Sequence, residues 1–282
     1  MKQQKIMGLD GWVEFLSKVE IPVLRHTARG LQALQQDKDK LSAREIAHVI
    51  KYDPLMTVKL LRYLQQNKRS SQEHEVVEVE QVLMMLGLEP MLRDIPAKPL
   101  AEEILGKQTM EALICLLHAI HRSNQASSYA FDWAVHLKDL HFEEISIAAL
   151  LHDIAELLMW CFSPTEMLKI RTMQQQDKTL RSSVVQTQVF GFSLDELKSE
   201  LAVKWSLPTL LITLMDDQHA HLDRVRNVSL AVNLARHAAN GWDDAALPDD
   251  YRDIAKLLKL DTDEVINLIN AKSDNNHAMK IA

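Results

Sequence analysis

A chain of 282 residues is long enough to form one large domain or two modest ones, each with a buried core. Hydrophobic residues make up 47% and charged residues 25%, as in ordinary globular proteins, and the net charge of −7 gives no sign of a basic surface for nucleic acid. Only 7 glycines and 8 prolines occur, too few for a strand-rich fold with many tight turns, so the composition predicts an all-α protein.

Apolar residues at helical spacing predict helices throughout the first hundred residues. Residues 1–20 are expected to form an amino-terminal helix, whose buried face contains Trp12, Phe15, Leu16 and Val19. A second helix is expected within residues 21–36, with Pro22 in its first turn.

Two sequence patterns predict where the next helices begin. Ser42 and Glu45 have the spacing of a capping box, in which each side chain bonds the backbone of the other residue. Asp53 directly precedes Pro54, which predicts a carboxylate N-cap followed by a proline at the first helical position.

A polar loop and a proline-rich segment interrupt this helical pattern. Residues 67–80 form the most polar stretch of the first half and are expected to be an exposed loop. The apolar run that follows predicts a helix that stops at Gly87. Residues 88–100 contain three prolines, and we expect them to separate two helical sub-bundles.

Longer helices are predicted in the second half. Residues 109–135 and residues 142–162 each have the pattern of one long helix, and the second places His152 and Asp153 in the middle of an apolar run. Further helix boundaries are expected at Ser163 with Pro164, at Gly191, and at the capping box of Ser193 and Glu196.

The two cysteines, Cys115 and Cys161, both lie inside apolar helical runs. Because the chain has no CxxC pair and its start does not resemble a secretory signal, both are expected to be reduced core residues of a cytoplasmic protein. No apolar run is expected to approach the roughly 20 residues that cross a bilayer, so no membrane contact is predicted.

Three stretches, in order, resemble the HDOD domain family, a bacterial signalling relative of the HD-type metal-dependent phosphohydrolases. They are residues 21–64, residues 76–91 and residues 145–160, and the motif "VKWSLP" follows at 203–208. The first stretch is the most specific, because its long ordered run ends in Asp-Pro and then "KLLRYL". The resemblance covers roughly residues 20–240.

The resemblance implies an all-α fold in which a small N-terminal helical bundle packs on a larger HD-like bundle. On this basis we expect an N-terminal helix at 1–20, an HDOD sub-bundle at 21–98, an HD-like sub-bundle at 99–240 and C-terminal helices at 241–282. It also implies a regulatory function in bacterial signal transduction.

The family relationship also implies which residues would hold a metal. An active HD site takes one histidine, a His–Asp pair and a late aspartate, and the bound ion lowers the pKa of a water molecule for attack on phosphorus. Here His152 and Asp153 keep the pair, but Arg122 and Arg236 align with the other two positions. Since guanidinium cannot ligate a cation and can instead pair with Asp153, we expect a vestigial site with no catalytic residue and no cofactor.

Two histidines keep a divalent-metal site open as an alternative. His118 lies one turn before Arg122 on the same helical face. His219, in "MDDQHAH", aligns with a position where the family often has a histidine, so a surviving site would use His152, Asp153 and His219.

Together these patterns predict a non-catalytic regulatory protein that binds a signalling protein or a small ligand. No receiver, kinase or cyclase domain is visible, so the unknown partner is expected in trans, and a homodimer stays open. The groove near Asp53, His152 and Asp153 is the expected contact surface. The alternatives are an HD-type metal-dependent phosphohydrolase that acts on cyclic nucleotides, and a sensor that binds a nucleotide through Arg122 or Arg236.

Overall fold

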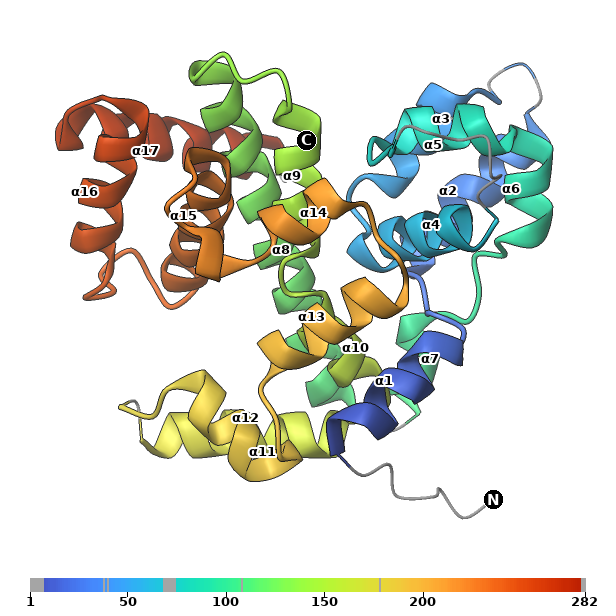
Figure 1. The fold of residues 1–282 in the computed structure, drawn as a ribbon, viewed down its shortest axis with the longest axis horizontal. Coiled ribbons are helices and arrows are strands. Elements are labelled where there is room, and N and C mark those ends of the chain that lie inside the picture. The colour runs from blue at the N-terminus through green and yellow to red at the C-terminus, as the bar shows by residue number, and fades with distance from the viewer. Residues whose placement is uncertain are drawn as a thin grey trace.

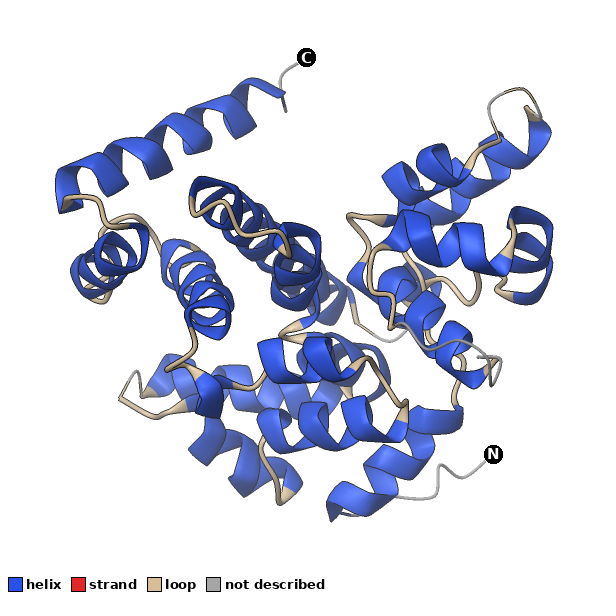
Figure 2. Ribbon diagram, turned by 45° about the horizontal axis from the view of Figure 1, so that its top comes forward, coloured by secondary structure: helices blue, strands red, loops and turns tan. Residues whose placement is uncertain are grey.

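The computed structural model describes residues 8–37, 39, 41–67, 75–107, 109–177 and 179–279, with side chains as far as residue 270. Figures 1 and 2 show that helices make up the regular structure of this described part. Its one β-type contact is an isolated parallel bridge between Val23 and Leu100. The prediction of an all-α fold is therefore confirmed.

The first part of the chain forms a group of short helices, in which α3 contacts α2, α4 and α5. We call α2 to α6 the N-terminal sub-bundle, which lies at the upper right of Figure 1. The helices of this first part are α1 (Gly8–Lys18), α2 (Arg25–Gln36), α3 (Ala43–Ile50), α4 (Pro54–Gln66), α5 (Val79–Leu86) and α6 (Leu88–Asp94).

The rest of the chain is organised around one long helix, α8, which packs against α7, α9, α10, α11 and α15. We call α7 to α15 the main bundle, and α16 and α17 extend it at the left of Figure 1. The elements are α7 (Ala101–Gly106), α8 (Met110–His136), α9 (Phe142–Leu151), α10 (Ile154–Phe162), α11 (Pro164–Gln176), α12 (Ser182–Phe190), α13 (Leu194–Lys204), α14 (Thr209–Leu214), the 3-10 helix η1 (Asp217–His219), α15 (Asp223–Ala238), α16 (Leu247–Leu258) and α17 (Thr262–Met279).

Most predicted helix boundaries are confirmed in their hydrogen bonds. The Asp53 carboxylate accepts from the backbone N–H groups of Leu55 and Met56, at 3.1 and 3.0 Å, so it caps α4 as expected. The capping box of Ser193 and Glu196 starts α13. Gly191 ends α12 with a φ of 88°, and Gly87 ends α5 with a φ of 83°.

Helix α1 packs against α13 of the main bundle, although it precedes the N-terminal sub-bundle in the chain. Phe15 meets Phe162 edge to face, with ring centroids 5.4 Å apart. From α4, the buried Arg62 donates to the carbonyl oxygens of Leu16 and Val19, at 3.4 and 3.0 Å. Helix α1 therefore holds the two parts of the chain together.

Two details of the first part differ from the sequence prediction. Pro22 lies before α2, because the backbone N–H of Leu24 donates to the buried Asp53 carboxylate at 2.9 Å and Val23 pairs with the linker at residue 100, which keeps this stretch extended. Residues 88–94 are helical, so the break between sub-bundles is the linker of residues 95–100. The predicted loop at 67–80 falls partly outside the described residues.

The predicted single helix at 142–162 is wrong in one respect, because a turn at His152 and Asp153 divides it into α9 and α10. The whole stretch is 21 residues long and apolar enough to span a membrane by length and composition, which corrects the expectation that no run reaches this size. However, 78% of its most apolar window is buried inside the fold, as is typical of core helices.

Candidate functional site

The His152–Asp153 pair lies where α9 ends and α10 begins, in the interior of the main bundle. His152 is 5% exposed and contacts Asp217 of η1, while Asp153 contacts Arg236 of α15. The two side chains also contact each other, and both of their other partners come from later in the chain. We call this group of contacts the polar network.

Both ring nitrogens of His152 meet carboxylates. Its Nδ1 lies 3.1 Å from Oδ1 of Asp153, and its Nε2 lies 3.3 Å from Oδ2 of Asp217 at the start of η1. Burial acts to lower the pKa of His152, but the hydrogen bonds to Asp153 and Asp217 outweigh it and raise that pKa above its usual 6.5. Each ring nitrogen of His152 thus faces a carboxylate oxygen within hydrogen-bond distance.

Asp153 is in turn paired with an arginine from α15. The Nη2 atom of Arg236 lies 3.0 Å from Oδ1 of Asp153. Burial acts to raise the pKa of Asp153, yet the charge of Arg236 and the hydrogen bond from His152 hold it well below the usual 3.8. Arg236 therefore provides the positive charge that the Asp153 carboxylate needs in its buried position.

Arg122 binds a different acid from the one we expected. Its Nη2 atom donates to both oxygens of Glu156, at 2.9 and 3.0 Å, rather than to Asp153. Trp160 donates to the same Glu156 carboxylate at 3.2 Å, from one turn further along α10. The negative charge of Glu156 raises the pKa of Arg122 and outweighs burial, which acts to lower it.

The carboxylates of the polar network are engaged by protein groups. Arg122 pairs with Glu156, Arg236 pairs with Asp153, and His152 lies between Asp153 and Asp217. A metal ligand must be neutral imidazole or a free carboxylate lone pair, and the guanidinium groups add repulsion toward any cation. The donor set therefore does not fit a divalent ion.

The other predicted ligands lie outside the network. His219 is half exposed and bonds Asp216 at 2.9 Å, and His118 is exposed on α8. Within the part of the chain that the structure describes, no group of three or more His, Cys, Asp or Glu side chains is arranged to hold a metal ion.

Sequence reasoning missed Glu156 and Asp217. Glu156 falls one helical turn after His152, a spacing that places side chains on the same face and could have indicated a role. Asp217 belongs to the acidic stretch before His219. The sequence analysis considered only the histidine of this stretch, whereas Asp217 is the residue that contacts His152. The Ser229 hydroxyl on α15 also donates to Asp217.

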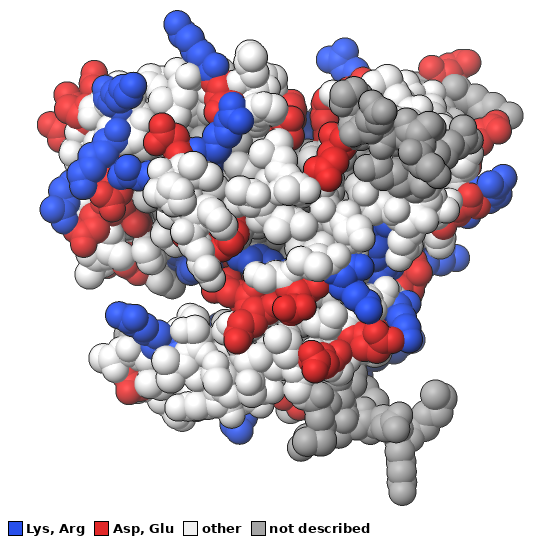
Figure 3. All heavy atoms as spheres, viewed as in Figure 1, with Lys and Arg blue, Asp and Glu red and all other residues white. Residues whose placement is uncertain are grey.

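The groove expected near Asp53, His152 and Asp153 is not open at Asp53, which is fully buried. A cavity of about 450 Å³ lies instead beside the network, between the start of α13 and the turn before η1. Its lining includes several acidic side chains, and Figure 3 shows such side chains gathering near the middle of this face, over α13.

Comparison with known proteins gives a family for the chain and solved structures of similar fold. The family model described as HDOD domain matches residues 21–221. The MmoQ response regulator from Methylococcus capsulatus has a TM-score of 0.60 at 19% identity, over 86% of this chain and 99% of that one. A virulence factor from Campylobacter jejuni has a TM-score of 0.65 at 17% identity, over 89% of each chain. None of the curated proteins compared with the chain matches it.

Proposed function

This chain belongs to the HDOD domain family, and from that premise we propose that it is a non-catalytic regulatory protein of bacterial signal transduction. It acts in the cytoplasm by binding a signalling protein supplied in trans. A protein of similar fold is named a response regulator, which fits a signalling role.

One observation carries the non-catalytic part of the proposal, namely that arginines pair with the acidic side chains of the polar network. Hydrolysis at an HD site needs a metal-activated water, and the ion needs neutral or anionic ligands with unused lone pairs. Here both ring nitrogens of His152 face carboxylates, and Arg236 donates to the Asp153 carboxylate. The network therefore supports a structural function for these residues, which fix α9, α10, α15 and η1 relative to one another.

The same pairing argues against a nucleotide at Arg122 or Arg236. Arg122 already donates to both oxygens of Glu156, and Arg236 is bound to Asp153. A phosphate would have to displace one of these carboxylates, at the cost of leaving it unpaired in a partly buried position.

Elemental analysis of the purified chain, combined with a phosphodiesterase assay, tests the proposal. We expect no stoichiometric Fe, Mn or Zn, and no hydrolysis of bis(4-nitrophenyl) phosphate or cyclic dinucleotides after incubation with those metals. The matched variant is Asp153→Ala, which should behave like the wild type in both measurements. Stoichiometric metal or hydrolysis that this variant loses would establish the phosphohydrolase instead.

A further inference from the structure

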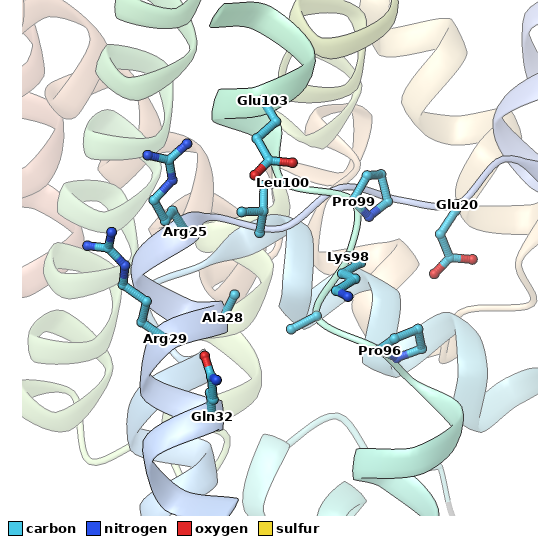
Figure 4. Close-up of a pocket in the computed structure, with 11 residues that line it drawn as sticks. Glu20, Arg25, Ala28, Arg29, Gln32, Pro96, Lys98, Pro99, Leu100 and Glu103 are labelled. Atoms are coloured by element: carbon cyan, nitrogen blue, oxygen red, sulfur yellow. The ribbon is translucent and has the colours of Figure 1, made fainter.

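The larger of the two cavities described lies away from the polar network, between the start of α2 and the linker of residues 95–100 (Figure 4). Its volume is about 970 Å³, at the upper end of the range for small-molecule sites. None of the residues of the polar network lines it. The lining residues are Glu20, Arg25, Ala28, Arg29, Gln32, Pro96, Ala97, Lys98, Pro99, Leu100 and Glu103.

The linker wall of this cavity is fixed by buried hydrogen bonds. The Val23 N–H donates to the carbonyl oxygen of Pro99 at 2.9 Å. The buried Lys59 ammonium donates to the carbonyl oxygens of Pro96 and Lys98, at 2.8 and 2.7 Å. A wall held in this way does not have to be ordered by a ligand, which lowers the entropic cost of binding.

The α2 wall presents two guanidinium groups to the solvent. Arg25 and Arg29 are one helical turn apart, and Figure 4 shows their side chains extending in the same direction. Within the described residues, neither guanidinium has an ion-pair partner, unlike Arg122 and Arg236. Guanidinium pairs are the groups that bind phosphate oxygens in a bidentate manner.

The end of α2 is not itself the anion site. The Glu102 carboxylate already accepts from the backbone N–H of Arg25, at 2.9 and 3.0 Å. The side chains of Arg25 and Arg29 are therefore the donors that remain for a ligand. Lys98 adds a third cation to the lining of the cavity.

The rest of the lining suits a ring and its polar edge rather than a bare anion. Glu103 offers a carboxylate that accepts N–H or O–H donors, and Gln32 offers both a donor and an acceptor. Inorganic phosphate would leave these groups and the apolar surface unused. The apolar surface consists of Ala28, Pro96, Ala97, Pro99 and Leu100.

We propose that this cavity binds a nucleotide, with its phosphate on Arg25 and Arg29 and its base against the apolar linker wall. The site goes beyond the proposed regulatory function, because it names a ligand and a place that the polar network does not involve. Since the linker joins the N-terminal sub-bundle to the main bundle, a bound nucleotide would contact both parts of the chain.

Isothermal titration of the full chain with ATP, GTP and inorganic phosphate tests this proposal. We expect at least one nucleotide to bind the wild type, and to bind at least tenfold more tightly than phosphate. The double variant Arg25→Ala/Arg29→Ala should weaken nucleotide binding by roughly 10- to 100-fold, the loss expected for charge-assisted hydrogen bonds. The control is Arg44→Ala/Arg181→Ala, which removes the same charge from exposed positions outside the cavity and should bind like the wild type.

Three results would overturn the proposal. They are no binding of either nucleotide, phosphate binding as tight as nucleotide binding, and equal losses in the two double variants. Circular dichroism of each variant confirms that it is folded, which is expected because all four arginines are exposed. None of these results bears on the metal and hydrolysis measurements, so the proposed function stands or fails separately.

Discussion

Replacing Asp153 by alanine removes the carboxylate that joins His152 to Arg236. The loss in the free energy of unfolding can be worked out from these two contacts. The buried Nδ1 of His152 loses its acceptor, and a hydrogen bond to a charged group contributes about 1.5–3 kcal/mol. The Arg236 side chain is 46% exposed, so water compensates it and its pair contributes only about 1 kcal/mol or less. We therefore expect Asp153→Ala to lower the free energy of unfolding by about 2–4 kcal/mol.

Urea denaturation of a double-mutant cycle measures this effect. Arg236→Ala alone should cost about 1 kcal/mol, and the double variant should cost less than the sum by about 0.5–1 kcal/mol, because both changes remove one shared contact. Glu200→Ala, an exposed carboxylate on α13, is the control and should stay within about 0.5 kcal/mol of the wild type. The reasoning is refuted if Asp153→Ala costs less than about 1 kcal/mol, or if a chelator destabilises the wild type by as much as the substitution does.

Lys59→Met should lower the free energy of unfolding, measured in urea, by about 2–4 kcal/mol, because three backbone carbonyl oxygens lose their buried donor. An unchanged free energy of unfolding would contradict this account. Asp53→Ala should cost about 2–4 kcal/mol by the same measurement, and Asp53→Asn should cost less since it keeps an acceptor for the backbone N–H groups. Because the folded-state pKa values of Asp153 and Asp217 lie below 3.8, the stability they contribute is complete above about pH 4 and is lost as pH falls toward those lowered values. Asp153→Asn should therefore make the acid limb of a stability–pH curve shallower, and an unchanged limb would show that Asp153 is not held ionised.

The helices could be predicted from the sequence where the signal was local. Periodicity gave α8 as a single long helix, and cap residues such as Asp53, Gly191 and Ser193 marked helix ends correctly. The turn at His152 could not be predicted in this way. The residues of this turn contact charged partners from α15 and η1, more than sixty residues away in the chain, which local periodicity does not indicate.

The sequence predicted which residues lie at the candidate site better than it predicted which of them form ion pairs with one another. The sequence indicated two arginines close to the His–Asp pair, and Arg236 does contact Asp153. It did not indicate that Arg122 would pair with Glu156. That pairing depends on how α8 is rotated relative to α10, and the rotation is set by packing. Arg25 and Arg29, which form no ion pair with a described residue, gave no signal in the sequence, since exposed arginines on a helix are ordinary until a cavity is found beside them.

The position of α1 has a consequence for how the chain is made. Residues 8–18 are synthesised about 180 residues before the surface that they cover on α13. During that interval α1 lacks the α13 surface, although an earlier partner, Phe162 of α10, is already present. The N-terminal sub-bundle can assemble from neighbours close in the chain, whereas the closing of α1 onto α13 must wait, and long-range contacts of this kind slow the last stage of folding.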